Sequence, residues 1–250
     1  MASRVNPGYF WTHNDSGDGP FVYAFDRRGA DFGKWRVTGA TAIDWEDIAI
    51  GPGPARRPHL FVGDIGDNEW KRRDVVVYRV AEPRISRQGV YATAPAKAFH
   101  FRYPDGPHDA EALLVHPVSG TIYIITKARG NDRETLVFRS AAPNYSEKME
   151  RVAGLHMPGE SDFTLVTGRI TGGDISPDGR RVALCDYFRG YEAVLPDGAD
   201  FEEIWKQPFK VVDIGKRRQG EGICYRLDGR ALLATSEGRS SPLIETVRVP

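Results

Sequence analysis

The chain has 250 residues, with 34 basic and 34 acidic side chains and a formal net charge of zero. That length fits one large domain with a substantial core, and the balanced charge argues against general binding to nucleic acid. No run of 18 apolar residues occurs, so we expect a soluble protein without a membrane span. The sequence shows no signal peptide, which is compatible with the bacterial cytoplasm or with an exported form whose signal has been removed. Nothing in it indicates an oligomer, so we expect a monomer.

Short runs rich in Val, Ile, Tyr, Phe and Trp alternate with turns that contain Gly and Pro, which predicts an all-β fold. An acidic residue at the start of a short apolar run recurs four times, in residues 45–49, 110–114, 173–176 and 220–224. Copies separated by about 50 to 65 residues are typical of propeller blades. The sequence therefore predicts a β-propeller.

We name the strands of each blade A to D, from the axis outwards. The first blade is expected to have strands B to D at 9–12, 21–25 and 34–37, with strand A missing or abbreviated. The next three blades are expected to be complete, at 45–50, 59–62, 75–80 and 98–103; at 111–115, 121–126, 135–139 and 148–152; and at 174–176, 181–185, 191–195 and 209–212. The last is expected to have strands A to C at 221–225, 231–235 and 242–249. The prediction is thus one domain over 1–250 with five four-stranded blades, and a six-bladed ring is the alternative.

In a propeller, the starts of the A strands and the ends of the B strands lie on one face, so their polar residues converge near the axis. The first A-strand position carries Glu46, Glu111, Gly173 and Glu221, and the next position carries Asp47, Ala112, Asp174 and Gly222. The expected B-strand ends are Asn14, Asp64, Lys127, Asp186 and Glu237. His13, Asp15 and His108 lie beside this ring.

Several carboxylates that share a partly buried space need protons or a cation to offset their repulsion. Oxygen donors without clustered cysteines suit a hard divalent cation, and Ca²⁺ tolerates irregular shells better than Mg²⁺ does. The candidate metal ligands are Glu46, Glu111, Glu221, Asp174, Asn14 and Asp186. Lys127 could supply part of the neutralisation, or the acids could instead bond backbone amides of the next blade and hold the ring together.

Other conspicuous residues have structural explanations. The two cysteines, Cys185 and Cys224, form no metal-binding pattern and are expected to be buried thiols. Trp11, Trp35 and Trp45 are expected to pack between blades.

Residues 11–18, 45–49, 63–68 and 220–223 resemble a family of bacterial β-propeller proteins across nearly the whole chain. This resemblance implies the fold and little about a substrate. A weaker similarity runs to the calcium-dependent propeller hydrolases, namely gluconolactonases, paraoxonases and organophosphate-hydrolysing propellers. Those enzymes carry a Glu at the start of an inner strand, as Glu46, Glu111 and Glu221 do here, and hold Ca²⁺ in the central channel. They have six blades and Asn-rich metal shells, whereas this sequence predicts five blades and more carboxylates.

Three functions follow from this pattern. The first is a promiscuous metal-dependent hydrolase of small-molecule esters, such as lactones, aryl esters or phosphotriesters, with its site in the central funnel. Its catalytic candidates are His13, Asp64, His108 and Lys127. The second is a glycoside hydrolase that uses two central carboxylates and a nearby aromatic platform. The third is a non-catalytic propeller that binds a small ligand or a protein.

Overall fold

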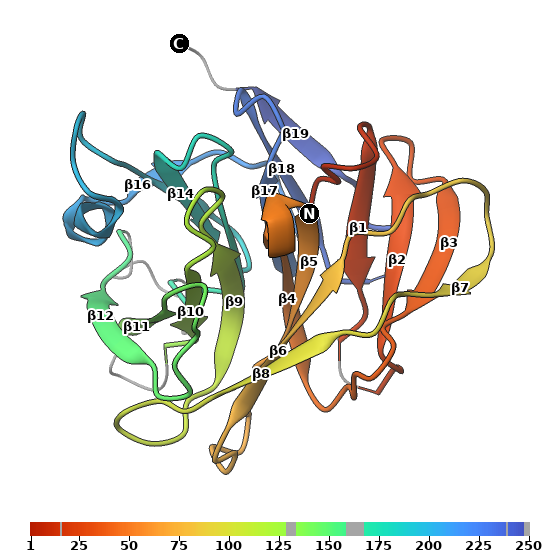
Figure 1. Ribbon diagram of the computed structural model, residues 1–250. Helices are drawn as coiled ribbons and strands as arrows, with labels where there is room; N and C mark the ends of the chain where they lie inside the picture. Colours follow the sequence, from red (N-terminus) through yellow and green to blue (C-terminus); the bar gives the residue numbers. More distant parts are fainter. Residues whose placement is uncertain (16, 129–133, 159–167, 239, 248–250) are drawn as a thin grey trace.

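Five sheets surround a central axis in the computed structural model (Figure 1). The structure describes residues 1–250 except 16, 129–133, 159–167, 239 and 248–250. Over the described residues four sheets have four strands and the fifth has three. The protein is therefore a five-bladed β-propeller, as the sequence predicts, and the six-bladed alternative is wrong. No helix among the described residues is long and apolar enough to cross a membrane.

The strands follow the chain from blade to blade. Blade 1 contains β1 (Tyr9–His13), β2 (Phe21–Asp26), β3 (Asp31–Arg36) and β7 (Val90–Ala92). Blade 2 contains β4 (Trp45–Pro52), β5 (Pro58–Asp64), β6 (Val75–Ala81) and β8 (Lys97–Phe101). Blade 3 contains β9 (Ala110–Val115), β10 (Ile122–Thr126), β11 (Thr135–Ser140) and β12 (Glu150–Leu155). Blade 4 contains β13 (Gly172–Ile175), β14 (Arg181–Cys185), β15 (Gly190–Val194) and β16 (Lys210–Val212). Blade 5 contains β17 (Gly220–Tyr225), β18 (Ala231–Ser236) and β19 (Ile244–Val247). Two short 3₁₀ helices, η1 (Pro54–Arg56) and η2 (Phe201–Lys206), lie between strands.

Blade 1 differs most from a regular blade. Its outermost strand, β7, comes from the segment between β6 and β8 of blade 2 and pairs in parallel with β3. On the inner edge of β1, Ala2 forms an antiparallel bridge with Phe10, and the N–H of Trp11 donates to the carbonyl of Met1 at 2.8 Å. Residues 1–3 are therefore an abbreviated inner strand, one of the two alternatives that the sequence leaves open, and Figure 1 shows this end of the chain near the axis.

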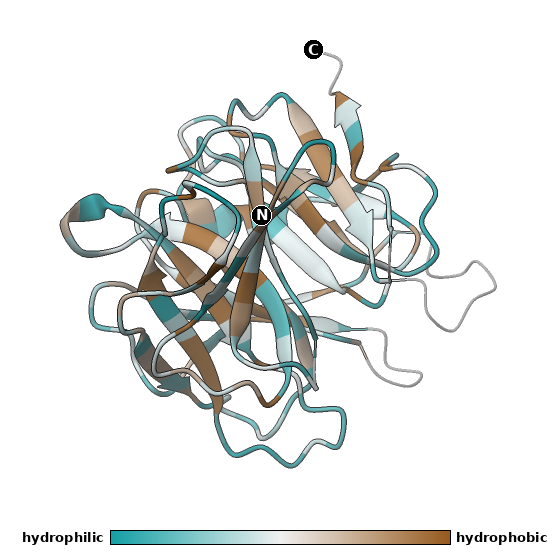
Figure 2. Ribbon diagram, turned by 90° about the vertical axis from the view of Figure 1, so that its right-hand side faces the viewer, coloured by the Kyte–Doolittle hydropathy of each residue, from teal (hydrophilic) through white to brown (hydrophobic). Residues whose placement is uncertain are grey.

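The apolar core is divided into five clusters of buried side chains, one at each interface between blades. The cluster between blades 1 and 2 contains Trp11, Trp35 and Trp45, which confirms their expected role. Phe10 of β1 and Leu233 of β18 belong to the cluster that closes the ring between blades 1 and 5. Figure 2 shows that the hydrophobic residues lie mainly along the strands and the hydrophilic ones mainly in the loops. Cys185 and Cys224 are free, buried thiols, as expected.

Candidate functional site

Three glutamates of the predicted ring occupy β-bulges at the starts of inner strands. In blade 2 the pairing of β4 with β5 skips Glu46, because the residues on either side of it pair with consecutive residues of β5. The pairing of β9 skips Glu111 and that of β17 skips Glu221 in the same way. Blade 4 has Gly173 at this place, and its register is unbroken. A bulge turns the extra residue out of the normal alternation, and bulges are frequent next to active sites.

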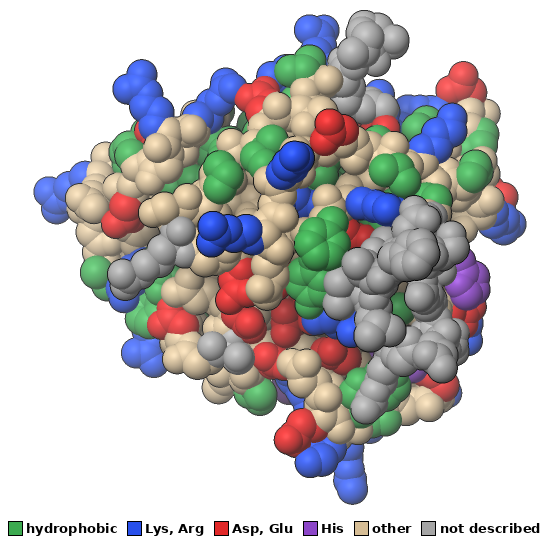
Figure 3. All heavy atoms as spheres, turned by 180° about the vertical axis from the view of Figure 1, so that it is seen from behind, with side chains coloured by type: hydrophobic (Ala, Val, Ile, Leu, Met, Phe, Trp, Pro, Cys, Tyr) green, Lys and Arg blue, Asp and Glu red, His purple; other side chains and the backbone are tan. Residues whose placement is uncertain are grey.

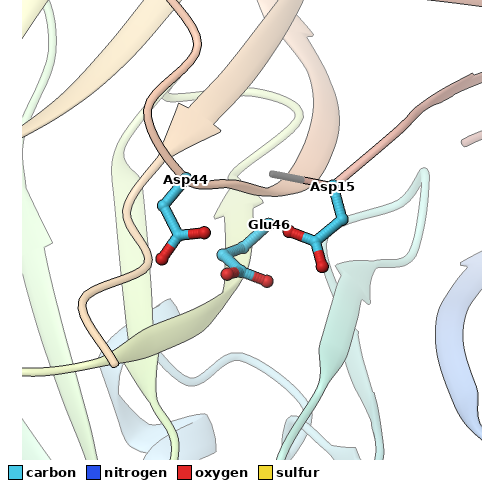
Figure 4. Close-up of side chains that lie close together, drawn as sticks. All are labelled: Asp15, Asp44 and Glu46. Carbon is cyan, nitrogen blue, oxygen red and sulfur yellow. The ribbon is translucent and has the colours of Figure 1, made fainter. Parts of the chain in front are cut away.

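Glu46 shares its space with two aspartates. Asp15 follows β1, Asp44 immediately precedes β4, and one carboxylate oxygen from each of the three residues lies within 4.8 Å of the others. Figure 4 shows the three side chains pointing toward one another from two neighbouring segments of the chain. We call Asp15, Asp44 and Glu46 the acidic triad.

The loop after β5 holds this arrangement in place. The buried carboxylate of Asp64 accepts the N–H groups of Ile43 and Asp44, both at 3.1 Å, which fixes the turn that precedes β4. A Cβ atom at Gly66 would lie 2.3 Å from Oε1 of Glu46 and 2.5 Å from Oδ2 of Asp44. A side chain at this position would have to displace the two carboxylates, so the backbone of Gly66 forms one wall of the triad.

Burial and mutual repulsion disfavour the charged form of these groups. The pKa of Glu46 is raised, first by burial and then by the charges of Glu111 and Asp15. Burial and the charge of Asp15 also raise the pKa of Asp44. A carboxylate in this position becomes stable when it takes up a proton or when a cation offsets its charge.

The other two ring glutamates already have hydrogen-bond donors. The Lys127 ammonium forms an ion pair with Oε1 of Glu111, and Nε2 of Gln219 donates to Oε1 of Glu221 at 2.9 Å. Burial raises the pKa of Glu111, and Lys127 opposes that shift. Burial alone would lower the pKa of Lys127, but the Glu111 carboxylate raises it, so the ammonium stays charged.

A pocket of about 240 Å³ opens beside this ion pair. Its wall is formed by Asn68, Trp70, Asp109, Lys127, Ala128, Arg169 and Tyr187. The Lys127 ammonium lies 5.5 Å from the centre of the Tyr187 ring, and the Asp109 charge contributes to the raised pKa of Glu46. The pocket thus places two aromatic rings and two cations beside the glutamates of the inner strands. Figure 3 shows acidic side chains gathered near the middle of one face of the molecule.

Two predicted metal ligands have carboxylates that are already occupied. Asp174 accepts the N–H groups of Ile175 at 2.8 Å and of Tyr225, on the inner strand of blade 5, at 2.9 Å. Asp186 is fully buried, and its oxygens accept three backbone N–H groups and the hydroxyl of Tyr191. The structure does not bring either residue into the triad.

Four other candidates also have hydrogen-bond partners. Nδ2 of Asn14 donates to Asp18 at 2.7 Å, and Nδ1 of His13 contacts the Asn14 carbonyl at 3.0 Å. Burial lowers the pKa of His13. Nε2 of His108 lies 2.9 Å from Oδ1 of Asp105, and its ring packs among three aromatic side chains. In addition to its two backbone donors, Asp64 pairs with Arg72 at 2.7 Å.

The sequence prediction missed Asp44 as a member of the site and placed Asp15 only beside it. A usable signal was present, since Asp44 and Glu46 are two residues apart, the spacing at which side chains of an extended segment lie on one side. Arg169 and Tyr187 of the pocket follow no repeat, and only the folded chain brings them to Lys127.

Comparisons with known proteins do not assign the chain to a family. No family model matches it, and no curated protein matches its sequence. Among solved structures, a protein of Bacteroides uniformis provisionally named a 6-phosphogluconolactonase is similar, with 12% identity over 98% of this chain and 69% of that one and a TM-score of 0.42. A Bacteroides fragilis protein with the same provisional name has 10% identity over 97% of this chain and 67% of that one and a TM-score of 0.43. Likenesses of this strength say nothing about the activity of this chain.

Proposed function

We propose that the protein is a divalent-cation-dependent hydrolase of small esters, with lactones, aryl esters and phosphotriesters as candidate substrates. The observation that supports this most is the acidic triad, whose three oxygens lie within 4.8 Å of one another beside the backbone of Gly66.

The triad has the dimensions and the chemistry of a hard-cation site. Ca²⁺–oxygen bonds are about 2.3–2.6 Å long, so two ligands of one ion are separated by at most about 5 Å. All three donors are carboxylate oxygens, which favours Ca²⁺ or Mg²⁺ over softer metals. Asp15, Asp44 and Glu46 would hold the ion, and other oxygen ligands would complete its shell.

A bound cation would polarise the carbonyl or phosphoryl oxygen of an ester. The neighbouring residues supply the remaining groups. Lys127 stays protonated and lines the pocket, so it can donate a hydrogen bond to the oxygen on which charge develops. Glu111 is a buried carboxylate that pairs with Lys127, and its raised pKa suits it to accept a proton from an attacking water. We assign this role to Glu111 because the oxygens of Asp64 already accept backbone and Arg72 donors.

The pocket also favours a second function, a glycoside hydrolase. Trp70 and Tyr187 could provide an aromatic platform beside Glu111, and a carboxyl with a raised pKa, as Glu46 has, could act as a general acid. The triad itself is more closely spaced than the roughly 5–10 Å between the two carboxyl groups of glycosidases. We therefore rank this function second.

The test measures bound metal and hydrolysis in the same samples. Protein dialysed against metal-free buffer is titrated with Ca²⁺ and Mg²⁺ by calorimetry, and is assayed with lactones, aryl esters, phosphotriesters and aryl glycosides, with and without chelator. We expect one ion per chain, ester hydrolysis that chelator abolishes, and cation affinity at least about tenfold weaker in Glu46→Gln. The matched control is Glu69→Gln, because Glu69 is exposed and its one ion pair among the described residues is with exposed Lys71.

Each alternative has its own result. If the protein hydrolyses glycosides and chelator does not affect this activity, the glycoside hydrolase replaces the ester hydrolase as the proposed function. A bound ion without turnover of any substrate would leave a binding propeller. Ester hydrolysis that survives complete removal of metal would refute the role of the cation.

A further inference from the structure

A second pocket lies outside the acidic triad, beside blade 5. It has a volume of about 550 Å³ and lies between the segment that leads into β17 and the loop that follows β18. Its charged and hydroxyl-bearing residues are Lys216, Arg217, Arg218, Ser236, Glu237, Ser240 and Ser241. Three cations and one carboxylate give this pocket a local excess of positive charge in a chain with no net charge.

Arg217 is the buried member of this group. Its exposed fraction is 8%, and Nη2 donates to the carbonyls of Asp186 and Arg189, both at 3.3 Å. Among the described residues, Nε and Nη1 have no hydrogen-bond partner, and the Arg217 charge acts on the buried thiol of Cys185. A guanidinium that is buried with two unpartnered nitrogens and no carboxylate is unfavourable by itself, so an anion in the pocket would offset its charge.

The two exposed cations are also available. Lys216 and Arg218 are exposed and form no ion pair with any described residue. The one acid of the pocket, Glu237, accepts a hydrogen bond from Nε2 of Gln219 at 2.5 Å. That hydrogen bond satisfies one of the two oxygens of Glu237.

The loop after β18 has an unusual backbone. Gly238 has φ +100°, and Ser240 has φ +58°, a conformation that residues other than glycine adopt at some cost. Such conformations persist where the surrounding structure requires them, and they are frequent at ligand-binding loops. Here they shape the wall of the pocket that faces the basic segment.

We propose that this pocket binds the phosphate group of a small phosphorylated ligand. Arginine forms paired hydrogen bonds to phosphate oxygens, and hydroxyl groups can complete the shell of acceptors. The pocket is much larger than a phosphate ion. The space that a phosphate group leaves unfilled suits an organic group. Gln219 bonds both Glu237 of this pocket and Glu221 of the glutamate ring, so the bound molecule would extend toward the central face.

Calorimetry with phenyl phosphate and with inorganic phosphate as probes tests this site. The variant pair Lys216→Gln and Arg218→Gln, made in one protein, removes both exposed cations and leaves the buried Arg217 in place. The control pair Arg84→Gln and Arg87→Gln removes two exposed basic residues of the segment before β7, with the same change in net charge. Melting temperatures of all proteins are measured first, so that a folding defect is recognised.

We expect phenyl phosphate to bind the unaltered protein and the control pair with one site and affinities within about twofold of each other. The pocket pair should bind at least about tenfold more weakly, since charge-assisted contacts are lost. Unchanged binding by Glu46→Gln would show that the phosphate site does not depend on the triad. Absence of binding, or an equal loss in the control pair, would overturn the proposal. Tighter binding of inorganic phosphate than of phenyl phosphate would overturn the proposal that the ligand carries an organic group.

Discussion

Asp47 is expected to stabilise the ring rather than to take part in chemistry, although it follows Glu46 directly. Its Oδ1 accepts the N–H of Ile48 at 2.8 Å, and its Oδ2 accepts the N–H of Leu113, on the inner strand of blade 3, at 2.9 Å. Leu113 is fully buried, so no water can replace the carboxylate. Replacing Asp47 by Ala therefore leaves a buried donor unsatisfied at the interface between blades 2 and 3.

The size of the effect follows from these two bonds. Leaving the buried N–H of Leu113 unsatisfied costs about 1–3 kcal/mol, and the local bond to Ile48 contributes about 0.5–1.5 kcal/mol. We expect Asp47→Ala to lower the free energy of unfolding by about 2–4 kcal/mol, which for a chain of this size is about 5–15 °C in melting temperature. Asp47→Asn keeps one acceptor and should lose about half as much.

Thermal and urea unfolding measure this prediction. Asp200→Ala is the control, because the exposed Asp200 caps η2 without a side-chain hydrogen bond and should change stability by less than about 0.5 kcal/mol. Asp174 makes the equivalent contact between blades 4 and 5, so the effects of Asp47→Ala and Asp174→Ala should add. If Asp47→Ala melts like Asp200→Ala but loses cation affinity, Asp47 is a ligand and the reasoning is wrong.

Three further outcomes test the site and its surroundings. Gly66→Ala should weaken cation binding at least about tenfold in calorimetry with the fold retained, because the added methyl group collides with the acidic triad; unchanged affinity would exclude the glycine wall. Lys127→Met removes the cation that holds down the pKa of Glu111, so the acidic limb of the pH profile of kcat/KM should move to higher pH; an unshifted limb would exclude Glu111 as the proton acceptor. Burial lowers the pKa of His116, so its contribution to stability is present above pH 6.5 and is lost as the pH falls. Between pH 5 and 7, the free energy of unfolding measured in urea should depend less steeply on pH in His116→Gln than in the unaltered protein. Equal slopes in the two proteins would contradict this.

The strand pattern could be predicted because each strand is marked locally. Alternating β-branched and aromatic residues end at turns, so the predicted strands of blades 2 to 5 overlap the observed ones, and β12 shows the largest displacement. Strand β7 could not be predicted, because its three residues carry no alternation of their own and are held by parallel pairing with β3. Non-local pairing of this kind leaves no trace in the segment itself.

The site was only partly predictable for the same physical reason. The repeat places Glu46, Glu111 and Glu221 at equivalent positions, and the structure gives all three a bulge. The bulge itself depends on how each inner strand pairs with its neighbour, which the sequence does not state. The ion pair of Lys127 with Glu111 and the position of Asp44 beside Glu46 likewise depend on how strands and loops meet on this face.

Neighbouring acids at the start of one strand have different roles because of the bulge. Glu46 is the extra residue, so its side chain leaves the sheet and meets the acids of other segments near the axis. Asp47 pairs with Gly63 of β5 in the regular register, and its carboxylate accepts a backbone N–H of the next blade. In blade 4, where Gly173 replaces the glutamate and the bulge is absent, Asp174 still bonds the next blade. The contact between blades therefore does not require the bulge. The bulge instead directs a glutamate toward the centre of the ring.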